Sequence, residues 1–138
     1  MKTAVERLAD AIGYPERVPE GGVSFVFQVD GAEVLAEETG GRLRLLTELS
    51  VEESQLPRFA SYAAGRMLRE DAVLSYGMPG NDQAMFLWQD APVTASEHEL
   101  SRLFETFADS CDWWRARVEE LRTSDQTKAM SQEMVIMP

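Results

Sequence analysis

The chain has 138 residues, of which 44% are hydrophobic and 27% charged, and its 24 acidic and 13 basic side chains give a net charge of −11. This is the composition of an ordinary globular domain rather than of a disordered chain. No apolar run approaches the ~20 residues that a bilayer-spanning helix needs, so membrane insertion is excluded. The negative charge repels phosphate backbones and argues against nucleic acid as a partner. It favours either a solvated acidic surface or the attraction of a basic partner.

Residues 1–122 are predicted to form a single domain and residues 123–138 a flexible C-terminal tail. A chain of this length can bury one continuous core. The helical repeat of apolar residues stops at about Arg122, and the rest is polar until Met134-Val135-Ile136-Met137. No signal-peptide pattern follows Met1, and the single cysteine, Cys111, cannot form an internal disulfide. We therefore expect a cytoplasmic protein.

The first half of the chain predicts one short helix followed by three strands. Apolar residues recur at helical spacing from Thr3 to Ile12, and Gly13 and Pro15 are placed to end that helix. Alternating or apolar runs then predict strands, separated by the turn signals Asp30-Gly31 and Gly40-Gly41, at 23–29, 32–38 and 42–49.

The second half predicts a helix, a hairpin and a long closing helix. Ser50 and Glu53 have the spacing of a capping box, which predicts a helix from there to about Arg69. A turn at 78–82 separates two further strands, 72–77 and 83–89, and the closing helix begins after Thr94 or Ser96. The predicted fold class is α+β, in the order α-β-β-β-α-β-β-α, with a five-stranded antiparallel sheet and three helices.

No catalytic, cofactor or metal site is predicted. His98 is the only histidine and Cys111 the only cysteine, and a zinc or iron site needs more such ligands. Cys111 lies on the apolar stripe of the last helix, which indicates a buried thiol rather than a nucleophile. The serines lack a histidine base in any hydrolase motif, and the glycine pairs do not open a helix as phosphate loops do.

Two apolar features remain as candidate binding surfaces. The second helix carries the small residues Ala60, Ala63, Ala64 and Gly65, which would let another backbone approach closely. Five strand residues are expected on the sheet face opposite the main alternating set, either as part of the core or as an exposed patch: Val26, Leu35, Leu46, Met85 and Leu87. Trp113, next to Trp114, is either half covered on the helix flank or an interface anchor.

The element order and three segments carry a family resemblance. The segments are Val23-Ser24-Phe25-Val26-Phe27-Gln28-Val29-Asp30-Gly31, Leu43-Arg44-Leu45-Leu46-Thr47-Glu48-Leu49, and Ala84-Met85-Phe86-Leu87-Trp88-Gln89 running into the Trp-Arg pair Trp114-Arg115. Over about Thr3 to Arg122 the chain resembles the class I chaperones of type III secretion, the Tir-chaperone or CesT-like family. It departs from the family at Trp88-Gln89-Asp90, where members often carry a more basic strand end, and in its longer tail.

The resemblance implies a bacterial, cytoplasmic, non-enzymatic homodimer that binds the N-terminal segment of a secreted virulence effector and keeps it secretion-competent without ATP. It also brings in the secretion ATPase as a further partner. The dimer contacts it implies are Leu56, Phe59, Ala60, Ala63, Met67 and Leu74. The effector contacts it implies are Val5, Leu8, Ile12, Val26, Leu35 and Leu46. A YbjN-like regulator or adaptor on the same fold is the first alternative, and an enzyme that uses Cys111 or His98 is the second.

Overall fold

The computed structural model describes residues 2–14, 18–66, 71–78 and 81–136. Within these residues the chain forms three α-helices, one 3-10 turn and a five-stranded antiparallel sheet, which confirms the predicted α+β fold. In chain order the elements are α1 (Ala4–Ile12), β1 (Ser24–Val29), β2 (Ala32–Thr39), β3 (Arg42–Leu49), η2 (Glu53–Gln55), α2 (Leu56–Arg66), β4 (Val73–Met78), β5 (Asn81–Pro92) and α3 (Glu97–Ile136).

The strands lie in the order β1-β2-β3-β5-β4, which makes β1 and β4 the edges of the sheet. Asp30 and Gly31 connect β1 to β2 with φ values of 50° and 84°, and Gly40 and Gly41 connect β2 to β3 with 57° and 78°. Positive φ at both central residues is the geometry of type I′ turns, whose twist matches that of the paired strands. The first three strands therefore form a tight meander, as the turn signals predict.

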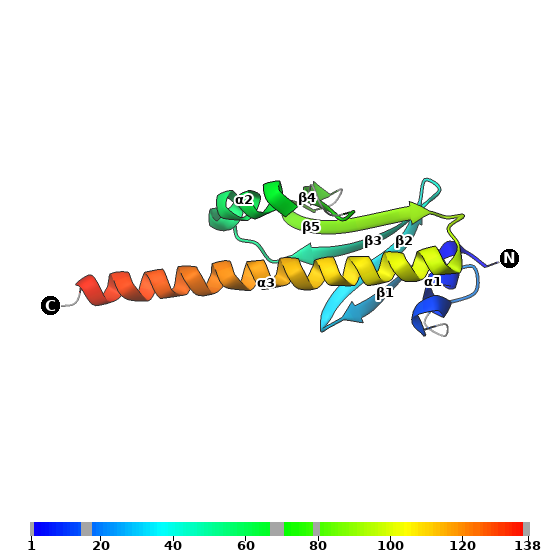
Figure 1. The fold of residues 1–138 in the computed structure, drawn as a ribbon, viewed down its shortest axis with the longest axis horizontal. Coiled ribbons are helices and arrows are strands. Elements are labelled where there is room, and N and C mark those ends of the chain that lie inside the picture. The colour runs from blue at the N-terminus through cyan, green and yellow to red at the C-terminus, as the bar shows by residue number, and fades with distance from the viewer. Residues whose placement is uncertain (1, 15–17, 67–70, 79–80, 137–138) are drawn as a thin grey trace.

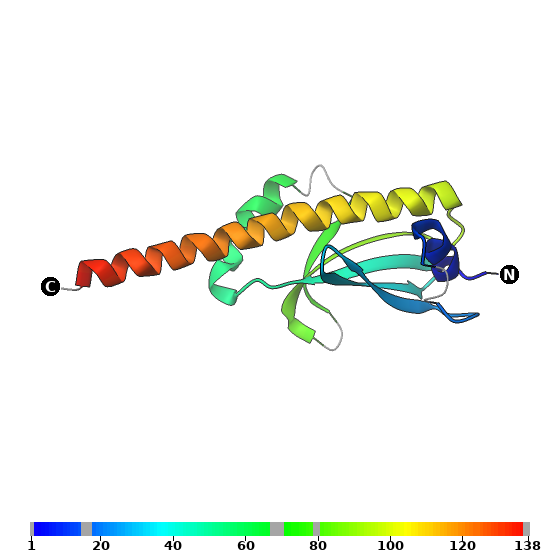
Figure 2. The same cartoon turned by 90° about the horizontal axis from the view of Figure 1, so that it is seen from below.

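One face of the sheet is covered by helices and the other is not. Figure 1 shows α3 running across the sheet with α1 beside its N-terminal end. In the view from below, α1 and α3 lie on the same side, and no helix of the described chain covers the opposite face (Figure 2). We call this opposite face the open face.

The core lies between the sheet and the two helices. Phe25, Leu45 and Leu87 point into it from the strands, and α3 contributes Phe107 and Trp114, each at most 7% exposed. Full burial of such side chains stabilises a fold by about 1.5–3 kcal/mol each. Cys111 is fully buried on the same stripe, in agreement with its apolar setting in the sequence.

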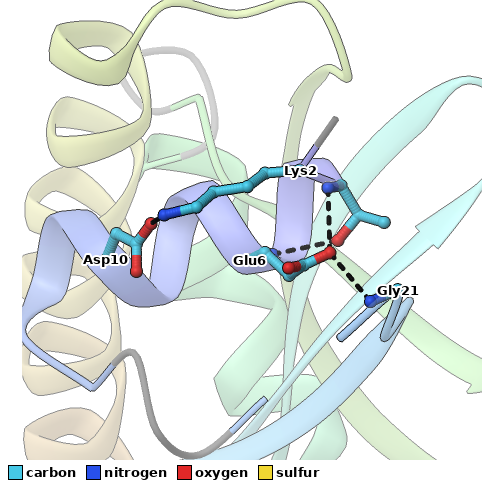
Figure 3. Close-up of polar contacts among 5 residues, drawn as sticks. Lys2, Glu6, Asp10 and Gly21 are labelled. Carbon is cyan, nitrogen blue, oxygen red and sulfur yellow. Dashed lines mark hydrogen bonds and ion pairs between the residues drawn. The ribbon is translucent and has the colours of Figure 1, made fainter. Parts of the chain in front are cut away.

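Three side chains cap the N-terminus of α1, those of Thr3, Glu6 and Glu38. Thr3 and Glu6 form a reciprocal capping box, and the Glu6 carboxylate also accepts from Gly21 N at 3.1 Å (Figure 3). The Glu38 carboxylate of β2 accepts from the amides of Ala4 and Val5, which otherwise lack helical partners. A carboxylate at this end also complements the helix dipole. These contacts fix α1 against the sheet.

Two helix boundaries differ from the prediction. The capping box before α2 is made by Glu52 and Gln55 around a 3-10 turn, not by Ser50 and Glu53. The start of the closing helix agrees with the prediction, since Ser96, one of its two predicted caps, accepts through Oγ from Glu99 N at 3.2 Å. That helix continues past Arg122 to Ile136 and projects beyond the sheet (Figure 1), although the apolar repeat that signals burial stops earlier. The flexibility of residues 123–138 stays a prediction.

Candidate protein-binding surfaces

A single row of residues crosses all five strands on the open face. Val26 pairs with Leu35, Leu35 with Leu46, Leu46 with Trp88, and Trp88 with Val73. Directly opposed residues in a sheet project to the same side and lie about 4.5–5.5 Å apart at Cβ. We call these five residues the apolar row.

The apolar row is only partly shielded by its own chain. Val26 is 51% exposed, and the other four members are half buried. The Trp88 indole N–H donates to Ser75 Oγ at 2.9 Å, so its polar atom is satisfied on the sheet and its ring is left as an apolar surface. A contiguous apolar surface on a face that no helix covers is typical of a partner site.

The two flanks of the apolar row differ in charge. On one side Arg44 forms an ion pair with Glu37, and Arg42 forms one with Asp90 at 2.9 Å, so the charges cancel. On the other side Glu33 and Glu48 are exposed, and neither has an ion-pair partner among the described residues. The second flank is therefore acidic, and we call it the acidic flank.

The apolar row begins at an open sheet edge. Strand β1 pairs only with β2, and Val23, just before it, is 53% exposed. A hollow of about 370 Å³ lies beside this edge, lined by Tyr14, Val26, Phe27 and Gln28. Unpaired backbone groups on an edge strand form a template for pairing with another chain.

A second surface is formed by α2, which its own chain hardly covers. Phe59 is the one buried residue of the helix, and its ring lies 5.0 Å from that of Trp114 between centroids. Ala60, Ala64 and Gly65 are exposed. Isolated short helices are marginal in water, so a helix with a single buried side chain gains stability if a partner covers it.

Trp113 sits beside this surface between two arginines. The guanidinium carbons of Arg66 and Arg117 lie 4.4 and 4.9 Å from the centre of its ring. Ser61 and Tyr62 complete a hollow of about 360 Å³ with Gly65, Arg66 and Trp113. Trp113 is thus half covered on the flank of α3, the first of its two predicted settings.

The residues proposed for effector binding separate into two groups. Val26, Leu35 and Leu46 come together in the apolar row. Val5 and Leu8 are fully buried on the opposite side of the sheet, and Ile12 is partly buried against the same core. An effector could reach Val5 or Leu8 only if α1 moved from its place.

The residues proposed for dimer contact also differ in exposure. Ala60 is open to solvent, whereas Leu56, Ala63 and Leu74 are half buried. Phe59 is 1% exposed and belongs to the core of its own chain. Met67 lies outside the described residues.

The assignment of Met85 and Leu87 to the open face is wrong. Leu87 is fully buried and Met85 packs against the core, so Phe86 and Trp88 take the open face of β5. The alternation is misleading because Gln89 faces the core, where its Nε2 donates to Thr106 Oγ1 at 2.9 Å. Trp88 and Val73 are therefore members of the apolar row that the sequence does not predict, and their register with Leu46 places them there.

One acidic pair lies where α3 meets the β1–β2 turn. Desolvation beside the β1–β2 turn and a hydrogen bond with the Asp30 carboxyl raise the pKa of the otherwise exposed Asp112, and nearby Arg115 opposes the shift. Arg115 itself donates to Val29 O and to Thr47 Oγ1, both at 3.2 Å. Helix α3 therefore contacts the end of the β1–β2 hairpin in two ways. The hydrogen bond from Arg115 to Val29 O is favourable, whereas the contact between Asp112 and Asp30 requires that one of the two carboxyls is protonated.

The described part of the chain contains no group of three or more His, Cys, Asp or Glu side chains that could hold a metal ion. Over the same residues no helix is long and apolar enough to cross a bilayer.

Comparison with known proteins identifies the fold. No family model and no curated protein sequence matches the chain. A chain in the solved structure of the HopA1-SchA chaperone-effector complex superposes with a TM-score of 0.62 at 14% identity, covering 82% of this chain and 91% of that one. The three helices and five-stranded antiparallel sheet described above therefore have the same fold as that chain.

Proposed function

We propose that this protein is a type III secretion chaperone that binds an N-terminal segment of a secreted effector in the bacterial cytoplasm. The observation that carries the proposal is the apolar row, which starts at the open edge of β1 and lies on a face that no described helix covers. The similarity to a chain in a chaperone-effector complex supports it.

The proposed site has two parts, the open edge of β1 and the apolar row, and each can bind part of an unfolded client. An extended part of the client can add main-chain hydrogen bonds to the edge strand β1, while an adjoining part of the client packs its apolar side chains on the apolar row. Val26 lies at the junction of the two, because it belongs to β1 and to the apolar row. The client stays non-globular while it is bound, which keeps it fit for a narrow secretion channel.

The proposed activity is binding without a nucleotide cycle. Ordering a client segment costs conformational entropy, which a large apolar interface offsets. Release then follows from competition at the secretion apparatus, where the secretion ATPase is the proposed partner.

The proposed assembly is a homodimer built through α2. Ala60, Ala64 and Gly65 leave room for a second backbone, and Tyr62, 37% exposed, lies on the rim of the hollow beside Trp113. A two-fold dimer places the same patch on both chains. It also doubles the client-binding surface.

Co-expression tests the proposed function. The tagged chain is produced together with each candidate secreted protein encoded near its gene, and each complex is treated with protease to map the protected client segment. Capture of one candidate through its N-terminal segment is the expected result. If every candidate stays uncaptured or insoluble, the proposal is wrong, and the regulator on the same fold becomes the better account.

A further inference from the structure

We infer that the open face selects a particular class of client segment, an amphipathic helix whose apolar side is bordered by lysine or arginine. This inference rests on the proposed function and adds the chemistry of the segment. The dimensions of the apolar row and the unequal charge of its two flanks support this choice of client.

The length of the apolar row sets the length of the segment. The row spans five strands from Val26 to Val73. Four inter-strand spacings of about 4.8 Å make it roughly 19 Å long. A helix rising 1.5 Å per residue covers that distance with about 13 residues.

The spacing of the row also favours a helix over an extended chain laid along it. A helix presents one apolar residue per turn of about 5.4 Å, close to the strand spacing of about 4.8 Å. Successive apolar side chains of the client therefore meet successive members of the row. An extended chain presents same-side residues about 6.8 Å apart and loses this match.

Charge decides which helix fits. The flank with Arg42 and Arg44 is neutralised by Asp90 and Glu37, so it offers no net charge to a client. Glu33 and Glu48 on the acidic flank stay unpaired in the described chain. A client with cations on that side pairs with them, and one with anions meets like charge. The net charge of −11 attracts the same basic segment from a distance.

The test compares two labelled peptides that differ only in charge. Both are helix-forming, about 14 residues long, with leucine once per turn, and carry either lysine or glutamate along one border of the leucine side. Binding to the full chain is followed by fluorescence anisotropy at low and at high salt. The lysine peptide is expected to bind about tenfold more tightly, a difference that salt reduces.

Variants assign that preference to the open face. The double variant Glu33→Lys, Glu48→Lys should reverse the preference for the lysine peptide, whereas Leu46→Glu should weaken the binding of both peptides. Glu53→Lys with Glu105→Lys is the matched control, because it makes the same change of net charge at exposed positions on η2 and α3 and should leave the preference intact.

Three results would overturn the inference. The first is equal affinity for the two peptides, and the second is a reversal of the preference by the control pair as large as that by Glu33→Lys with Glu48→Lys. The third is a change in the oligomeric state of the Leu46→Glu variant, which would make the apolar row a contact between copies of this chain. The inference also fails separately from the proposed function. If the Leu46→Glu variant still captures a secreted client, the inference about the open face fails but the chaperone proposal stands. If the chain selects peptides by charge but captures no secreted client, the chaperone proposal fails and the open face is only a peptide-binding site.

Discussion

The rings of Phe59 and Trp114 lie 5.0 Å apart between centroids and join α2 to the core on α3. Phe59 is the one buried side chain of α2, so this contact fixes the position of the helix. The helix in turn presents the surface that we propose for dimerisation. Core packing and assembly are thus linked through one aromatic pair.

Replacing Phe59 with alanine is expected to cost about 3–5 kcal/mol of unfolding free energy, because it empties a fully buried aromatic site. Urea unfolding followed by circular dichroism measures the loss. Tyr62→Ala on the same helix is the control and should stay within about 1 kcal/mol in the monomer, since Tyr62 is 37% exposed. Equal losses for the two variants would show that Phe59 does not anchor α2.

Gly65→Ala should separate the stability of the monomer from that of the dimer. A Cβ at this position meets nothing within 4 Å in the chain itself. Alanine is favoured over glycine in helices by up to about 1 kcal/mol, and Gly65 lies in the last turn of α2, so monomer stability should rise by a part of that amount. If a second α2 packs closely here, the dimer dissociation constant should rise as well. A more stable chain with an unchanged dimer would remove Gly65 from the interface.

Ala60→Glu is expected to give a folded monomer. Ala60 is exposed in the chain, so the substitution spares the core, but a two-fold axis near it would bring two carboxylates together. Sedimentation velocity reports the oligomeric state and circular dichroism the fold. Ser54→Glu, exposed just before the helix, is the control that should remain dimeric. A dimeric Ala60→Glu would contradict an interface on this side of α2.

Val26→Glu should weaken client binding at least tenfold without unfolding the chain. The side chain is 51% exposed at the start of the apolar row. Tyr76→Glu is a control of matched exposure, 52%, on the other face of the sheet. Isothermal titration with the protected client segment compares the two. An equal loss of affinity for both variants would place the client elsewhere.

Asp112→Asn is expected to stabilise the protein at neutral pH but not in acid. Because the folded state raises the pKa of Asp112 above its usual 3.8, folding favours the protonated carboxyl. The stability linked to this group is complete below that value and is lost as the pH rises through the raised pKa. Thermal unfolding of both proteins from acid to neutral pH should show the difference growing with pH. A constant difference would exclude this linkage.

The sequence predicts the element order well because its local signals are strong. The Asp30-Gly31 and Gly40-Gly41 turns fix the first meander, and Thr3 and Gly13 bound α1 as expected. The prediction of which β5 residues face the core was partly wrong. Their orientation depends on the tertiary setting of Gln89, a polar residue that is buried beside Thr106.

The binding surfaces were harder to predict than the fold. Apolar residues at Val5 and Leu8 look the same in a sequence whether a core or a partner covers them, and here the core does. The apolar row appears only when the strand register places Trp88 opposite Leu46. Register is a long-range property that no local pattern encodes.

The most direct test of the chaperone proposal is light scattering of the purified chain, alone and after co-expression with secreted proteins encoded nearby. The proposal predicts a dimer of about 31 kDa, twice the 15.5 kDa of one chain, that gains the mass of one client N-terminal segment. A stable monomer that gains no mass with any candidate would contradict it.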